Sequence, residues 1–168
     1  MIHSNEIVVR PATNAHFAAI IELRALLLEG SGASYACTSI EEQQRWREAY
    51  EGWLNDELQS SPQIRLLVAL SGSQVVGCVT GFIDRRAPGP DCLNGSCGWV
   101  QSMVVLPAFR SRGLSRVLMR ALMSWFETMQ VGKVVLQSTA AAEPLYLTMG
   151  YHRSTESIWS WQAREHCA

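Results

Sequence analysis

Apolar residues recur along this chain with two different spacings. After a short apolar segment at residues 7–11, they return every three or four positions over residues 13–28 and again over residues 39–58. This spacing predicts a first strand followed by two amphipathic helices. Thr13 is a suitable N-cap for the first helix, and Ser39 opens a capping-box pattern for the second.

The middle of the chain changes to β-type runs. Residues 64–70 and 75–83 are rich in β-branched and other apolar side chains, and Ser71-Gly-Ser-Gln74 between them is typical of a tight hairpin. Residues 85–96, rich in Gly, Pro, Asn and Asp, predict a loop. A further strand is predicted over residues 98–106.

The last third of the chain returns to helical spacing over residues 113–129. A short strand over 133–137, a small helix over 141–149 and an alternating, strand-like segment over 157–162 follow. This order predicts one domain of the α/β (α+β) class, with a mixed, largely antiparallel central sheet flanked by helices. The helix over 113–129 should join two parallel strands by a right-handed crossover.

Composition narrows the class of protein without identifying it. The 168 residues are 48% apolar and 17% charged, which suits a single folded domain. A net charge of -1 gives no indication of a nucleic-acid surface, and no apolar run is long enough to span a bilayer. The N-terminus lacks the basic and apolar blocks of a signal peptide, so we expect a cytoplasmic protein without membrane or nucleic-acid partners. Five cysteines without a Cys-x-x-Cys pair and four scattered histidines predict no metal site.

The junction between the strand at 98–106 and the helix at 113–129 carries the first chemical signal. A helix N-terminus offers N–H groups without intrahelical acceptors and a partial positive charge, and Gly113 lets an anion approach closely. Basic residues here oppose the helix dipole, so a bound anion explains them better than the alternative, a solvated N-terminus with basic residues on the surface. Neither a dinucleotide-binding Gly-x-Gly-x-x-Gly nor a P-loop is present. The residues expected around this anion are Arg110, Ser111, Arg112, Gly113, Leu114, Ser115 and Arg116.

The same loop resembles the coenzyme A motif of the GNAT family of N-acetyltransferases, Gln/Arg-x-x-Gly-x-Gly/Ala. Arg110, Gly113 and Ser115 occupy its positions, with Ser in place of the usual Gly or Ala. Val105-Leu-Pro107 resembles the family's strand end upstream. Leu145-Tyr-Leu-Thr-Met-Gly-Tyr151 resembles its helix end downstream. The resemblance implies an acetyl-CoA-dependent N-acetyltransferase domain over residues 1–168.

The resemblance also implies a mechanism in which an amine attacks the thioester directly, without an acyl-enzyme. The N–H of Val105 would stabilise the oxyanion, and Tyr146 would protonate the departing thiolate, unless Tyr146 only packs against Gly150 in the core. Ser138 or Thr139 would replace the asparagine that relatives often place before the tyrosine. The further cofactor contacts implied are Met103, Val104, Val105, Ser138, Thr139 and Tyr146.

The sequence offers several candidates for the general base that deprotonates the amine. Many relatives carry an acidic residue on the strand before the loop, but residues 98–106 contain none. Glu29 at the end of the first helix is the first candidate and Asp84 the second, although each is equally well a solvated surface carboxylate. A chain of water molecules, positioned by Gln101 and Ser102, would also suffice.

The acceptor is predicted to be a small-molecule amine. The acceptor site is expected between the first two helices, the loop after Asp84 and the final strands. Most of the aromatic side chains in these segments should be core, while a minority are candidates to line a pocket for a cationic amine. These side chains are Tyr35, Trp46, Tyr50, Trp53, Trp99, Trp159 and Trp161. A protein N-terminus or lysine, a non-catalytic acetyl-CoA-binding module and a nucleotide-phosphate binder remain alternatives, and a homodimer is left open.

Overall fold

The computed structural model describes residues 6–29, 36–156 and 158–161 and divides into two compact units, Met1–Gln137 and Ser138–Ala168. Each unit is treated by itself. The second contains α4 (Glu143–Thr148). In chain order, the elements of the first are β1 (Ile7–Pro11), η1 (Asn14–His16), α1 (Phe17–Leu28), α2 (Ile40–Ser60), β2 (Ile64–Ser71), β3 (Gln74–Arg85), β4 (Ser96–Val105), η2 (Pro107–Phe109), α3 (Leu114–Thr128) and β5 (Lys133–Leu136).

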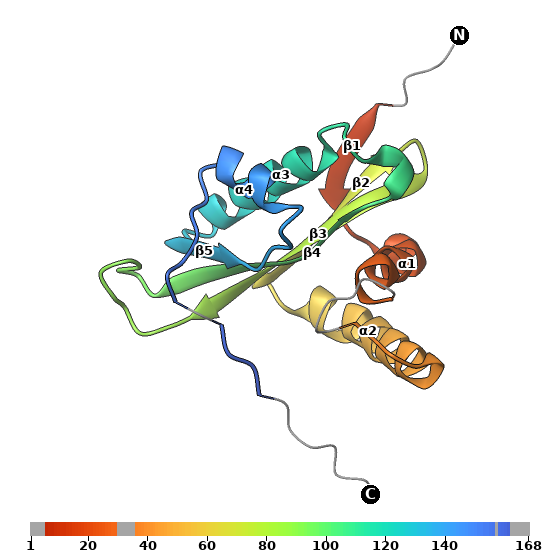
Figure 1. Cartoon of the computed structure of the whole chain (residues 1–168), viewed down its shortest axis with the longest axis horizontal. Helices are drawn as coiled ribbons and strands as arrows, with labels where there is room; N and C mark the ends of the chain where they lie inside the picture. Colours follow the sequence, from red (N-terminus) through yellow and green to blue (C-terminus); the bar gives the residue numbers. More distant parts are fainter. Residues whose placement is uncertain (1–5, 30–35, 157, 162–168) are drawn as a thin grey trace, which may run out of the picture. The chain divides into compact units, whose positions relative to one another are not determined.

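The five strands of the first unit form one sheet in the order β1-β2-β3-β4-β5 (Figure 1). The first four strands pair antiparallel with their neighbours, and β5 pairs parallel with β4. Ser71 pairs with Gln74 across a tight turn in which Gly72 has a φ of 61°, as primed hairpin turns require. The predicted hairpin and the mixed, largely antiparallel sheet are therefore confirmed.

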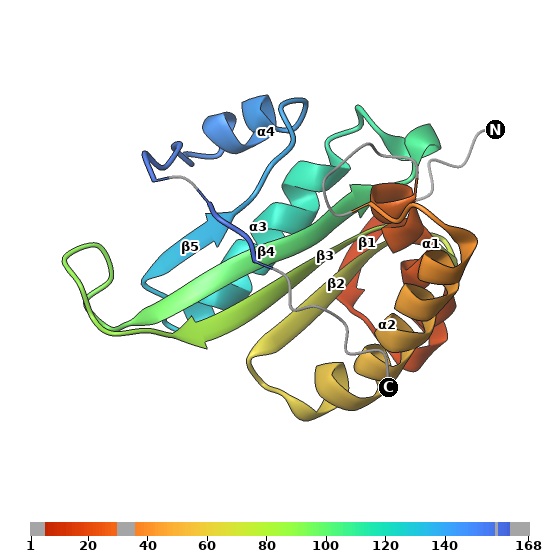
Figure 2. The same ribbon diagram turned by 60° about the horizontal axis from the view of Figure 1, so that its bottom comes forward.

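Helices cover both faces of this sheet (Figure 2). On one face α1 packs on β3 and β4, and α2 packs on β2; on the other, α3 packs on β2, β3 and β4. The predicted connection of two parallel strands by one helix is confirmed, because α3 links β4 to β5. The buried cluster beneath α1 and α2 consists of Phe17, Ile20, Leu23, Leu54, Leu66, Val68, Leu70, Val75, Cys78 and Val104.

Two glycines allow α3 to approach the other face closely. A β-carbon at Gly98 would lie 2.8 Å from a carbon of the Phe126 ring. At Gly81 it would lie 2.7 Å from a methyl carbon of Leu122. Because real β-carbons do not make contacts this short, these positions need glycine for the ring of Phe126 to lie against the strands.

The start of α2 shows how local sequence positions a helix. The hydroxyl of Ser39 accepts a hydrogen bond of 3.2 Å from the N–H of Glu42, as the capping-box pattern predicts. The carboxylate of Glu42 accepts from the N–H of Thr38 at 2.6 Å. Within the described residues, none of the helices combines the length and the apolar character needed to cross a membrane.

The second unit corrects one prediction. Residues 158–161 are not a strand, although their alternation resembles one, while residues 157 and 162 lie outside the described part. Alternation marks a strand only where a neighbouring strand supplies hydrogen-bond partners, and no ladder is formed by residues 158–161.

Candidate functional site

Strand β4 is irregular halfway along its length. Between the pairs Cys78–Val104 and Thr80–Gln101, one residue of β3 faces two residues of β4, the first of which is Ser102. Ser102 has a φ of 52°, in the left-handed region that non-glycine residues rarely adopt. An extra residue of this kind is a β-bulge, which bends the strand and re-aims its side chains.

Beyond this bulge, β4 separates from β5. The parallel pairing ends at Val100 and Leu136, whereas β4 continues to Val105. The N–H of Leu106 donates to the carbonyl of Val76 on β3 at 2.9 Å. Since successive amides of a strand face opposite edges, the N–H of Val105 faces away from β3, along the edge that β5 has left. This edge of β4 is therefore unpaired by β5 from Gln101 to Val105.

The loop that follows β4 forms a cradle at the start of α3. Ser111 and Gly113 have φ values of 60° and 77°, and a β-carbon on Gly113 would meet no atom within 4 Å. The first hydrogen bond of the helix joins the N–H of Val117 to the carbonyl of Gly113 at 3.1 Å. The N–H groups of Leu114 and Ser115 precede that bond and have no acceptor within the helix. Open space above such N–H groups fits an anion.

The arginines of the loop have different surroundings. Arg110 donates from Nε to the carbonyl of Val105 at 3.1 Å, which ties the loop to the end of β4. The guanidinium of Arg112 lies over the ring of Phe109, 5.2 Å from its centre. Arg110 therefore stabilises the loop besides adding positive charge to it, while Arg112 contacts a ring of η2, the 3-10 turn that leads into the cradle.

The predicted residues of the second unit, Ser138, Thr139 and Tyr146, are described within that unit only. The ring of Tyr146 packs edge-on against Tyr151, with ring centres 5.8 Å apart and planes at 71°. Burial raises the pKa of the Tyr146 hydroxyl above its ordinary value, and raises that of Tyr151 to about 12. Tyr146 is therefore protonated at neutral pH and able to donate a proton.

Both predicted bases are engaged in ion pairs. The carboxylate of Glu29 accepts from Arg47 at 3.1 Å, and the same guanidinium binds Glu22 at 2.5 Å. The hydrogen bonds that Arg47 donates to these two carboxylates raise its pKa. The exposed Asp84 pairs with Arg86 at 3.0 Å. Each carboxylate already accepts a hydrogen bond from a guanidinium, and these contacts favour a structural role over proton transfer for both acidic residues.

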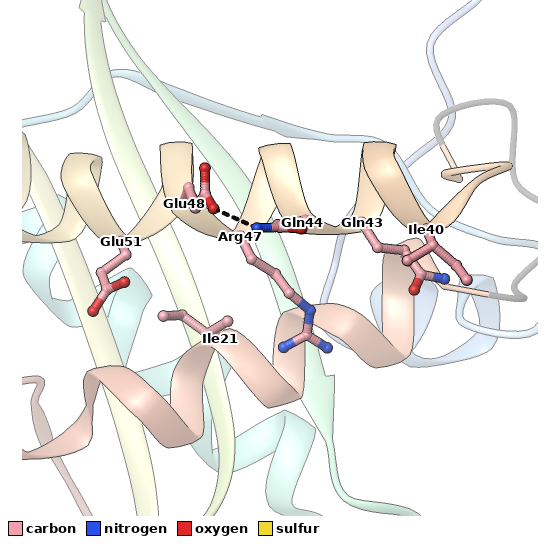
Figure 3. A pocket seen from close by; sticks show the side chains of 7 residues that line it. All are labelled: Ile21, Ile40, Gln43, Gln44, Arg47, Glu48 and Glu51. Carbon is pink, nitrogen blue, oxygen red and sulfur yellow. Dashed lines mark hydrogen bonds between the residues drawn. The ribbon is translucent and has the colours of Figure 1, made fainter.

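A groove of about 340 Å³ lies between α1 and α2. Figure 3 shows Arg47 reaching from α2 toward α1, and Gln44 hydrogen-bonded to Glu48 at 3.0 Å. The guanidinium of Arg47 binds the carboxylates of Glu22 in α1 and of Glu29 at its C-cap, so ion pairs across this groove connect the two helices. Its lining consists of Ile21, Ile40, Gln43, Gln44, Arg47, Glu48 and Glu51.

Three of the aromatic rings among which a minority were candidates to bind a cationic amine face arginines of this chain. Tyr35 lies outside the described residues, and Trp159 and Trp161 belong to the second unit. An aromatic ring covered by a guanidinium has no free face there for a second cation. The guanidinium carbon lies 4.6 Å from the ring centre for Arg24–Tyr50, 5.2 Å for Arg47–Trp46 and 5.3 Å for Arg86–Trp99.

Arg24 is a residue that sequence reasoning did not single out. It lies on α1, and its Nη1 donates to the hydroxyl of Ser102 at the bulge of β4. Arg24 occupies one of the positions that recur at helical spacing over residues 13–28. A charged side chain among these positions was the available signal, but its partner is 78 positions away in the sequence.

The cysteines and other potential metal ligands do not converge. Cys37, Cys78, Cys92 and Cys97 are free thiols. Across residues 6–29, 36–156 and 158–161, the structure brings together no group of three or more His, Cys, Asp or Glu side chains that could hold a metal ion.

The sequence matches a family model described as the Acetyltransferase (GNAT) family over residues 31–151. The match includes the bulge of β4, the cradle at Gly113 and Tyr146. A comparison with the curated proteins finds no match.

Solved structures with the same fold come from several organisms. A GCN5-related N-acetyltransferase from Ralstonia eutropha JMP134 is 19% identical, with a TM-score of 0.79 over 93% of this chain and 99% of that one. A predicted acetyltransferase with acetyl-CoA from Clostridium acetobutylicum is 15% identical, with a TM-score of 0.74 over 92% and 96%. Glucosamine-6-phosphate N-acetyltransferase from Arabidopsis thaliana is 18% identical, with a TM-score of 0.68 over 93% and 98%. At these identities the likeness shows the fold.

Proposed function

This chain belongs to the Acetyltransferase (GNAT) family and is an acyltransferase, and from that premise we propose that it transfers an acetyl group from acetyl-CoA to a small-molecule amine. The observation that carries the proposal is the continuous path formed by the free edge of β4 and the cradle at Gly113. An extended donor with a diphosphate at one end needs both features, in this order along the chain.

The cradle supports the diphosphate end of acetyl-CoA in this proposal. The N–H groups of Leu114 and Ser115 would bind it above Gly113, while Arg112 and Arg116 add positive charge. The pantetheine arm would then follow β4 from Met103 to Val105, where amides lack a β5 partner. The similar structure from Clostridium acetobutylicum is described with acetyl-CoA, which supports this choice of donor.

The reaction proposed is a direct acyl transfer within a ternary complex. The amine nitrogen attacks the thioester carbonyl carbon and forms the C–N bond, and the carbonyl oxygen becomes an oxyanion. The N–H of Val105 donates a hydrogen bond to this oxygen, an interaction typically worth about 3 kcal/mol. The carbonyl then re-forms as the C–S bond breaks, and Tyr146 donates its proton to the coenzyme A thiolate. The proton that the nitrogen loses on becoming an amide returns to Tyr146 through water.

The proton of the attacking ammonium is proposed to leave through water. Glu29 and Asp84 each bind an arginine, so neither carboxylate is free to accept this proton. Gln101 and Ser102 lie at the bulge of β4 and carry groups that can position a water molecule. This arrangement supports a water relay over Glu29 as the route for deprotonation.

Release of free thiol from acetyl-CoA, followed over a panel of amines, tests the proposed function. We expect turnover with at least one small amine and a product heavier by one acetyl group in mass spectrometry. Acetyl-CoA binding without turnover would instead support a non-catalytic module. Faster turnover of peptides with a free N-terminus or lysine would support a protein acceptor. Calorimetry showing ATP bound and coenzyme A ignored would support a nucleotide-phosphate binder.

A further inference from the structure

A cation from α1 lies beside the bulge of β4. Arg24 is half-buried and follows the buried residues Ile20 and Leu23 of the same helix. Its Nη1 donates to the hydroxyl of Ser102, and its guanidinium carbon lies 4.6 Å from the centre of the Tyr50 ring. This position places a positive charge on the face of the sheet that α1 and α2 cover. The charge lies beside Ser102, which is three residues before Val105 along β4.

The charge of Arg24 has no acidic partner among the residues that the structure describes. A guanidinium carries five N–H donors, and the hydrogen bonds of Arg24 go to the side chains of Ser102 and Tyr50. Arg47 on the neighbouring helix differs, because it binds both Glu22 and Glu29. These contacts leave N–H donors of Arg24 that can bind an anion at the exposed part of its side chain.

The groups packed around Arg24 are neutral. Burial raises the pKa of Tyr50 and raises that of Cys78 to about 12, so neither the phenol nor the thiol serves as the counter-ion at neutral pH. The ring of Trp53 stacks on Tyr50 at 5.7 Å, and Thr80 contributes a buried hydroxyl. Aromatic and hydroxyl groups of this kind screen charge poorly, which strengthens the attraction of Arg24 for an anion.

We infer that the acceptor is an amine that also carries an anionic group, a carboxylate or a phosphate, and that Arg24 binds this group. The inference rests on the proposed acetyl transfer. A guanidinium matches carboxylate and phosphate oxygens with paired hydrogen bonds, which fixes the orientation of the molecule that bears them. Ser102 and Val105 are three residues apart, about 10 Å along a strand. The amine and the anionic group should therefore lie within about 10 Å of each other in one small molecule.

Matched pairs of acceptors test this assignment. The panel contains amino carboxylates with their amides and aminoalkyl phosphates with their amino alcohols, which separates the two sources of negative charge. We expect wild-type kcat/KM to be about 10- to 100-fold higher for the anionic member of at least one pair. Arg24→Gln should remove that preference by raising KM for the anionic acceptor about 10- to 100-fold, with kcat/KM for the neutral one changed less than about threefold.

Two further variants report on charge. Arg24→Lys should restore part of the preference, because it keeps the charge and loses the planar donor pair. Arg24→Glu should reverse the preference, so that diamines become better substrates than amino carboxylates. A purely structural role of Arg24 would not produce this reversal.

Arg65→Gln is the matched control. Arg65 also lies over an aromatic ring, that of Trp125 at 5.5 Å, but Trp125 belongs to α3 on the opposite face of the sheet. The acceptor preference of Arg65→Gln should equal that of wild type. Wild-type turnover without preference for anionic acceptors, or an equal loss for both members of a pair in Arg24→Gln, would overturn the inference and leave acetyl transfer intact. No turnover with any amine, despite acetyl-CoA binding in calorimetry, would refute the proposed function and the inference together.

Discussion

The donor cradle and the wall around Arg24 belong to opposite faces of one sheet and are built differently. The cradle is continuous in sequence, from the end of β4 through Gly113 to the first turn of α3. It binds through backbone N–H groups and the open space above one glycine. The wall combines single side chains of α1, α2 and β4, namely Arg24, Tyr50 and Ser102. A contiguous site can be recognised as a motif, whereas a site assembled from distant side chains exists only after folding.

This difference also separates the two substrates. In the proposed function, the backbone cradle binds the diphosphate common to every coenzyme A thioester, whatever the acceptor is. Side chains from α1 and α2 determine the chemistry of the acceptor wall and can differ without altering β4 or its loop. We therefore expect donor binding and acceptor selectivity to respond to separate mutations.

Gly113→Glu should have the largest effect and should act on the donor alone. The substitution places a carboxylate in the open space above the helix start, on a residue with a φ of 77° that disfavours any side chain. We expect the affinity for acetyl-CoA, measured by calorimetry, to fall by at least about a thousandfold.

Two glycine variants control this experiment. Gly52→Glu adds the same carboxylate at an open position of α2 and should bind acetyl-CoA normally. Gly113→Ala keeps the backbone strain without the charge and should lose far less affinity. Wild-type affinity in Gly113→Glu would show that the cradle does not hold the diphosphate.

Tyr146→Phe should lower kcat by about a hundredfold and leave acetyl-CoA affinity unchanged, because it removes the proton donor and keeps the ring. Burial raises the pKa of Tyr146, and an acid acts only while protonated. Activity of the wild type should therefore persist through pH 10, near the ordinary pKa of tyrosine, and fall only above it. The variant should lack this alkaline limb.

Tyr151→Phe is the matched control for Tyr146, because its ring packs against the same side chain. Its kcat and its alkaline limb should equal those of wild type. If the two variants lose activity equally, packing of the two rings matters and proton donation by Tyr146 does not.

Two glycine-to-alanine variants should change stability in opposite directions. Gly98→Ala forces a β-carbon against Phe126 under α3 and should lower the free energy of unfolding by about 1–3 kcal/mol. Gly52→Ala, in α2 with open space around it, should raise the free energy of unfolding by about 0.5–1 kcal/mol. Urea denaturation measures both. Equal effects would contradict the close packing of α3 on the glycines of the sheet.

Glu29→Gln should have the smallest effect on catalysis, a change in kcat of less than about threefold, since its carboxylate binds Arg47. Glu22→Gln removes the other partner of Arg47 and is the control. A loss of about a hundredfold or more in Glu29→Gln alone would identify Glu29 as the general base and contradict the water relay.

Much of the fold was readable from local patterns. The hairpin at Gly72, the cap at Ser39 and the helix that begins after Gly113 each depend on residues within a few positions of one another. The strand predicted over 157–162 was wrong for residues 158–161, because a strand depends on a partner that alternation cannot specify. The environment of an aromatic ring is likewise not specified by local sequence. Tyr50 lies on α2, and the arginine over its ring, Arg24, lies on α1.

The sequence by itself determined the family and the proposed donor loop, because the motif residues Arg110, Gly113 and Ser115 lie within one strand–loop–helix segment. Tertiary structure decided the rest. Packing of α1 on β4 brings Arg24 into contact with Ser102. Packing of α1 beside α2 allows Glu29 and Arg47 to form an ion pair. Charge and burial depend on neighbours in space, so the chemistry of the acceptor wall appeared only when the helices lay on the sheet.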